Sequence, residues 1–191
     1  MKVFESIRKD PEKQGGWLLV GAVLLFAVGS AALDGIWQGT TGIVARVLAW
    51  ALIYAFLGLM LLWQIKTAFR ADIFGLLLAL LAITLWIRLP LMSYASKDYI
   101  DCLGEWTAAI RQMPGLSSLG QTIGDYNAPY FYLLFAIAKA VPAAGELYWM
   151  KLFSIAFEAV GAVAVMRLVS LATRKRIAQF SSLFAALILP S

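Results

Sequence analysis

The chain has 191 residues, of which 62% are hydrophobic and only 14% are charged, and its formal net charge is +5. A soluble domain carries roughly a quarter charged residues, so this composition excludes an ordinary soluble protein and predicts an integral membrane protein. The positive charge fits basic loops beside an anionic leaflet, and we expect no nucleic-acid partner. With no His and a single Cys in the sequence, an intramolecular disulfide and a zinc or iron site of the usual His/Cys type are excluded.

The first half of the chain predicts a short tail and three membrane spans. Residues 1–16 mix basic and acidic side chains without a signal-peptide cleavage pattern, so we interpret them as a cytoplasmic tail. Apolar runs at 15–33, 47–65 and 73–87 approach the ~20 residues needed to cross a bilayer. The third run can extend to residue 92, past a proline. Residues 34–46 are predicted to form a short polar turn between the first two spans.

A long segment, residues 88–125, follows the third span and is predicted to contain a helix. Loops of this length are usually functional or carry structure of their own. Asp98, Asp101 and Glu105 fall away from an apolar stripe in this segment, which predicts a short amphipathic helix lying in the membrane interface. The stripe recurs at spacings of three and four residues and consists of Tyr99, Leu103, Trp106, Ile110 and Met113.

Three further apolar runs, at 126–141, 149–172 and 177–191, predict a fourth, a fifth and an unfinished sixth span. We therefore expect an all-α, polytopic transmembrane helical bundle in which the whole chain is one membrane domain. Its parts are the tail at 1–16, three spans within 17–92, an external loop at 93–127 and the further spans within 128–191. Because the last run is cut off, we expect the chain to be an N-terminal portion of a longer protein.

The distribution of charge gives one agreement and one conflict with this topology. With the N-terminus inside, Lys66 and Arg70 fall inside and the long acidic loop falls outside, as the positive-inside rule prefers. The basic run 174–176 then falls outside, against the rule, so the short fourth span is the doubtful crossing. Glu158 lies within an apolar run, where an unpaired charge is costly, and we expect it to pair inwardly with another helix.

Three short runs in the second half point to a known family. They are Ser96-Lys97-Asp98-Tyr99 with Leu103 and Trp106, Asp125-Tyr126-Asn127 with Pro129-Tyr130, and Lys151-Leu152-Phe153 ahead of Glu158. Together they resemble bacterial GT-C glycosyltransferases related to the mannosyltransferases of glycolipid-anchor assembly, over residues 88–191. Glu105 stands where that family usually has a proline, and the family's later helices are not matched.

The resemblance implies a multi-pass enzyme of the bacterial plasma or inner membrane. Such an enzyme moves a sugar such as mannose from a polyprenyl-phosphate donor in the bilayer to an acceptor hydroxyl on the outer side. Asp98 is then the catalytic base. Asp101 is a candidate second carboxylate, and the pair could hold a divalent cation, the one cofactor that we consider. A helix N-cap at Asp98, with Asp101 in the first turn, is the structural alternative.

Other candidates follow from their chemistry and position. Arg88, Lys97 and Arg111 are candidate contacts for the donor phosphate, with snorkelling or headgroup contact as the alternative. The candidate sugar-contacting or loop-shaping residues are Tyr99, Trp106, Asp125, Tyr126, Asn127 and Tyr130. The alternatives for them are turn formation and an aromatic belt at the membrane interface.

A different class of function is also open. A non-catalytic integral membrane subunit or scaffold would use the long loop as a docking element. A small transporter fits less well, because the first three spans contain almost no polar residues.

Overall fold

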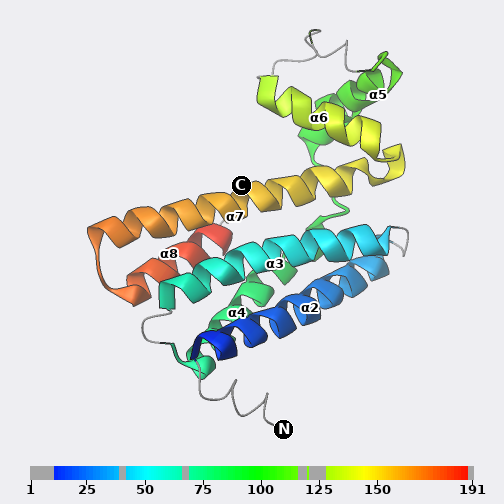
Figure 1. The fold of residues 1–191 in the computed structure, drawn as a ribbon. Coiled ribbons are helices and arrows are strands. Elements are labelled where there is room, and N and C mark those ends of the chain that lie inside the picture. The colour runs from blue at the N-terminus through cyan, green and yellow to red at the C-terminus, as the bar shows by residue number, and fades with distance from the viewer. Residues whose placement is uncertain (1–10, 39–41, 66–68, 116–119, 121–127, 189–191) are drawn as a thin grey trace. The chain divides into compact units, whose positions relative to one another are not determined.

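The computed structural model describes residues 11–38, 42–65, 69–115, 120 and 128–188, and this part of the chain forms helices and no strands (Figure 1). The all-α helical bundle predicted from the sequence is confirmed. The chain divides into two compact units, and its description as one membrane domain stays a prediction. The first comprises Met1–Pro90 and Ala156–Ser191, and the second comprises Leu91–Ile155.

Among the described residues, four helices are long and apolar enough to cross a membrane, as an integral membrane protein requires. They are Lys13–Gly35, Ile43–Ile65, Ala71–Leu91 and Ala143–Ala172. Helix α6 (Ala128–Ala140) has 13 residues, which is about 20 Å at 1.5 Å per residue, against a hydrocarbon core of ~30 Å. Over its described residues α6 is therefore shorter than a crossing needs. The crossing predicted at 126–141, whose first two residues lie outside the described residues, stays a prediction. Helix α8 (Arg176–Ile188), in the predicted sixth span, is described over the same short length.

The first unit is built on α2 (Pro11–Gln38), α3 (Ile43–Ile65) and α4 (Ala71–Trp86), with α2 packed mainly on α3 and also on α4. Two glycines let α2 and α3 approach closely, as small residues do between membrane helices. A Cβ at Gly58 would overlap the side chain of Leu19.

A second contact of the same kind lies further along the two helices, with the glycine on α2 and the leucine on α3. A Cβ at Gly15 would lie 2.6 Å from Leu62 Cδ1. Each helix thus offers one glycine and inserts one leucine, and this reciprocal fit holds the pair in one register.

Polar side chains buried between α2, α3 and α4 tie these helices together. Ser30 Oγ lies 3.0 Å from Tyr54 Oη and accepts a hydrogen bond from Trp86 Nε1 at 2.9 Å. Trp50 Nε1 donates to the buried carboxylate of Asp34 at 3.3 Å. Such interhelical hydrogen bonds contribute about 1 kcal/mol each in a membrane. Helix α2 ends at Gln38, so it continues beyond the start of the polar turn that we predicted at 34–46, and Asp34 is a buried residue of this helix.

A second polar contact joins the end of α4 to α7 (Glu146–Ala172) and α8. Arg88 forms an ion pair with Glu158 of α7, and it donates to the carbonyl of Leu187 in the last turn of α8. The inward-facing pair expected for Glu158 is confirmed. The guanidinium neutralises a carboxylate in an apolar helix and satisfies a carbonyl that a helix end leaves unpaired.

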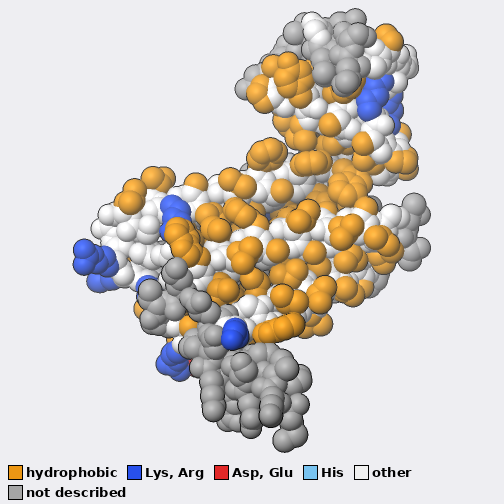
Figure 2. Space-filling view, viewed as in Figure 1, with side chains coloured by type: hydrophobic (Ala, Val, Ile, Leu, Met, Phe, Trp, Pro, Cys, Tyr) orange, Lys and Arg blue, Asp and Glu red, His pale blue; other side chains and the backbone are white. Residues whose placement is uncertain are grey.

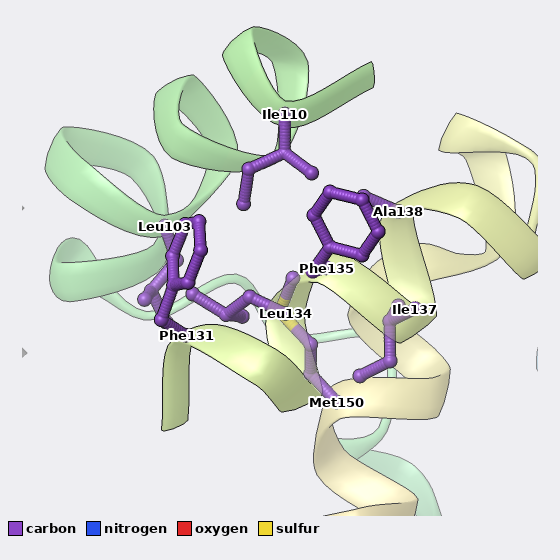
Figure 3. Close-up of a cluster of buried hydrophobic side chains, with 8 residues drawn as sticks. All are labelled: Leu103, Ile110, Phe131, Leu134, Phe135, Ile137, Ala138 and Met150. Atoms are coloured by element: carbon purple, nitrogen blue, oxygen red, sulfur yellow. The ribbon is translucent and has the colours of Figure 1, made fainter. Parts of the chain in front are cut away.

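The second unit contains a π-helical turn at Tyr99–Leu103, α5 (Gly104–Gln112), α6 and the first turns of α7. Figure 3 shows its core, a cluster of buried side chains from these elements. The cluster consists of Leu103, Ile110, Phe131, Leu134, Phe135, Ile137, Ala138 and Met150.

The apolar stripe predicted for this segment is confirmed, because Tyr99, Trp106 and Met113 pack against the cluster that Leu103 and Ile110 enter. The placement of this helix in the membrane interface stays a prediction. Side chains of α6 cover the face, so packing within the unit already accounts for the stripe.

Candidate functional site

The helix that carries Asp98 begins with a cap provided by Ser96. Ser96 Oγ accepts a hydrogen bond from the backbone N–H of Tyr99 at 3.2 Å, and the Ser96 carbonyl accepts one from Ile100 N–H at 3.1 Å. The carboxylate of Asp98 makes no capping hydrogen bond at this helix start, and its backbone is already helical. The N-cap alternative for Asp98 is therefore wrong. Asp98 lies exposed in the first turn, where the helix dipole favours a negative charge.

The π-helical turn changes the register of this helix just after Asp98. The backbone N–H of Gly104 donates to the carbonyl of Tyr99, five residues earlier. A Cβ at position 104 would lie 3.2 Å from that carbonyl oxygen, so glycine suits the tight turn. Single π-turns inside α-helices occur frequently at functional sites.

Three carboxylates share the exposed side of the helix, and we call Asp98, Asp101 and Glu105 the acidic face. All three are exposed, whereas Leu103 and Ile110 are buried on the other side. No three acidic or cysteine side chains come together as a metal site within the described ranges. A divalent cation at Asp98 and Asp101 would therefore need further oxygen ligands from water or substrate.

A polar network centred on Glu146, the first residue of α7, lies in the second unit. Glu146 is only 6% exposed. Its Oε1 accepts hydrogen bonds from Tyr99 Oη at 2.8 Å and from the buried Thr107 Oγ1 at 3.0 Å. Its Oε2 accepts one from Arg111 Nη2 at 2.8 Å. A buried carboxylate is tolerated when it is paired and hydrogen-bonded in this way.

Two cations tie the C-terminal ends of α5 and α6 to each other. Arg111 Nη1 donates to the carbonyls of Ala138 and Val141 at 2.6 and 2.7 Å. Lys139 Nζ in turn donates to the carbonyls of Arg111 and Met113 at 3.1 and 2.7 Å. Each helix thus supplies a positive charge to the carbonyl end of the other, where the dipole favours it. The guanidinium of Arg111, a candidate contact for the donor phosphate, thus binds groups of this network.

Tyr99 joins the network to the helix that carries the acidic face. Burial, followed by the hydrogen bond to Glu146 and the charge of that carboxylate, raises the pKa of Tyr99 to about 12. The phenol therefore remains neutral and able to donate at physiological pH. Its hydrogen bond fixes the residue next to Asp98, and this gives Tyr99 a structural function whether or not it contacts a sugar.

The other candidates are distributed over the chain. Lys97 is exposed beside Asp98, and Arg88 is engaged with Glu158 in the first unit. Trp106 and Tyr130 are half-buried against the apolar cluster. Three candidates lie outside the described residues, namely Asp125, Tyr126 and Asn127.

Glu146, Thr107 and Lys151 have polar contacts that we did not predict. Lys151 Nζ donates to the carbonyls of Leu91 and Tyr94 and so satisfies a turn after α4. An acidic residue directly after a Pro and Gly segment and ahead of an apolar run is a signal for a helix N-terminus, and it could have identified Glu146. Comparisons with known proteins found no family model, no curated protein and no solved structure that matches this chain.

Proposed function

We propose that this chain is a membrane-embedded glycosyltransferase of the GT-C type, or the N-terminal part of one. It transfers a sugar from a polyprenyl-phosphate donor to an acceptor hydroxyl. The observation that carries the proposal is the exposed acidic face, with Asp98 in the first turn of its helix beside a π-turn. Asp98 removes the proton of the acceptor hydroxyl as its oxygen attacks the sugar carbon, and the polyprenyl phosphate leaves with the bonding electrons.

The number of long helices supports an outer location for this site. If α6 does not cross, α4 and α7 are the two crossings between Arg70 and the basic run 174–176. Arg70 and the basic run 174–176 then lie on the same side of the membrane, and the positive-inside rule makes that side the cytoplasmic one. The acidic face, between α4 and α7 in the chain, comes to lie outside. The conflict that six predicted spans produced for residues 174–176 no longer arises.

The network around Glu146 supports a catalytic use of the same helix. A general base has to be held in reach of the proton that it removes, and a rigid element holds it better than a mobile loop. Tyr99 and Thr107 bind the Glu146 carboxylate from the inner side of the helix. Asp98 and Asp101 are therefore presented from a fixed support.

A non-catalytic membrane subunit is the second candidate, and one observation favours it. Arg88 and Arg111, two of the three candidate phosphate contacts, have carboxylate partners within the protein. In this alternative the acidic face is a docking surface for the catalytic partner. For a catalytic site, Lys97 is the candidate phosphate contact that remains.

Replacing one carboxylate tests the role of Asp98. Membranes containing the full chain are incubated with radiolabelled polyprenyl-phosphate mannose, and also with the glucose analogue, and transfer of label to any acceptor is measured. We expect Asp98→Asn to lower transfer by about 100-fold or more, since a positioned base contributes about 10²–10⁴. Glu105→Gln is the matched control, because it removes an exposed charge from the same helix and should retain transfer. Full transfer by Asp98→Asn, at an unchanged membrane level, would exclude Asp98 as the base.

A further inference from the structure

Several basic side chains of the first unit, namely Arg70, Arg167, Arg174, Lys175 and Arg176, belong to one end of its helices. Gln64, near the end of α3, contacts both Gln179 of α8 and Arg167 of α7. These contacts bring the C-terminal ends of α3 and α7 and the start of α8 to the same end. Figure 1 shows this end at the left, together with the start of α4, and Figure 2 shows Lys and Arg side chains over it.

The corner between α7 and α8 is the most strongly charged part of this end. Three consecutive basic residues, 174–176, connect the two helices, and Arg174 and Lys175 are exposed. Lys175 N–H donates to Thr173 Oγ1 at 3.2 Å, which defines the turn without using either charged group. Asp72, the acidic side chain described at this end, already forms an ion pair with Arg70 at 2.6 Å.

Exposed tryptophans place this end at the level of lipid headgroups. Trp17 is 61% exposed and Trp63 is 51% exposed, and tryptophans gather where membrane meets water. The guanidinium of Arg167 lies over the Trp63 ring, 3.4 Å from its centroid. Lys13 and Trp17 line a shallow hollow of about 290 Å³ at the start of α2.

We infer that this basic end, with Arg174, Lys175 and Arg176 at its centre, binds the headgroup phosphates of anionic phospholipids. The tryptophans place the surrounding helices at headgroup depth, and the surplus of positive charge selects a negative surface over a zwitterionic one. Guanidinium and ammonium groups both bind phosphate oxygens well. The inference is independent of any catalytic activity.

Native mass spectrometry of the purified full chain tests this inference. The protein is titrated in mixed micelles with phosphatidylglycerol and with phosphatidylcholine of the same acyl chains, and the lipid retained is counted. We expect the wild type to retain phosphatidylglycerol in clear preference. Each Lys or Arg beside an anionic surface raises the affinity for that surface about fivefold. The variant Arg174→Gln/Lys175→Gln/Arg176→Gln should therefore lose about tenfold or more of that preference.

Two further variants separate charge from folding. Arg174→Lys/Arg176→Lys keeps the charge and should keep the preference. Arg174→Gln/Lys175→Gln leaves Arg176 in place and should lose part of it, with helicity by circular dichroism as the check on folding. Equal retention of the two lipids by the wild type would overturn the inference. An unchanged preference in the triple Gln variant would also overturn it.

Discussion

Replacing Glu146 with Gln perturbs the polar network of the second unit with little change in side-chain volume. The substitution exchanges the carboxylate that accepts from Arg111 for an amide of no charge. A hydrogen bond to a charged group contributes about 1.5–3 kcal/mol, and breaking a buried pair costs about 3–5 kcal/mol. The Arg111 side chain is 26% exposed and keeps its two carbonyl partners. We therefore expect a loss of about 2–3 kcal/mol.

The loss is measured on the full chain in detergent, by unfolding with dodecyl sulfate followed by circular dichroism. Glu105→Gln is the control, because it removes an exposed carboxylate and should change stability by less than about 0.5 kcal/mol. Hydrogen exchange locates the effect. Exchange should accelerate in residues 99–112 and 128–140, while α2 and α3, which belong to the other compact unit, should be unchanged.

A double-mutant cycle with Arg111→Gln then isolates the pair. If the two side chains stabilise the unit through each other, their coupling should be about 1.5–3 kcal/mol. Additive effects of the two substitutions would refute this reasoning. The reasoning would also be refuted if Glu146→Gln were as stable as the wild type, because the carboxylate would then make no net contribution to stability.

Two other predictions follow from the buried polar groups. Tyrosinate absorbance should show a group that titrates near pH 12 and is lost in Tyr99→Phe. The pKa of Tyr99 in the folded protein lies above its ordinary value of 10.0. The contribution of Tyr99 to folding stability is therefore complete below pH 10 and is lost between about pH 10 and 12. If the absorbance lost in Tyr99→Phe titrates near pH 10, the phenol is not held as described. Arg88→Met leaves Glu158 without its ion-pair partner and should cost about 3–5 kcal/mol, whereas Arg88→Met/Glu158→Leu should recover most of it. Dodecyl sulfate unfolding measures both, and a double variant no more stable than the single one would argue against the pair.

Much of the fold was predictable because the bilayer imposes simple requirements on a sequence. Long apolar runs must form helices, since only a helix satisfies its own backbone in lipid. The runs at 15–33, 47–65 and 73–87 accordingly became α2, α3 and α4. The run at 126–141 is a harder case, because the length of an apolar run does not say what covers it. Side chains of its described part pack on the Leu103 and Ile110 face, and whether the run crosses the membrane stays a prediction.

The candidate site was predicted in part, for a related reason. The spacing of apolar residues placed Asp98, Asp101 and Glu105 on the exposed side of a helix, and this is confirmed. The π-turn and the cap at Ser96 were not predicted, because the closure of one local turn depends on a hydrogen bond that periodicity does not encode. Asp98 as a catalytic base stays a prediction.

By itself, the sequence determined that the protein is helical, that it has the composition of a membrane protein, and which side of the amphipathic helix is exposed. These properties follow from hydropathy and its period, which act residue by residue. Only the tertiary structure decided which partner each buried charge has. Arg111 with Glu146 and Arg88 with Glu158 are 35 and 70 residues apart in the chain. Such pairs are selected by the energetic cost of an unpaired charge, and that cost depends on the folded surroundings.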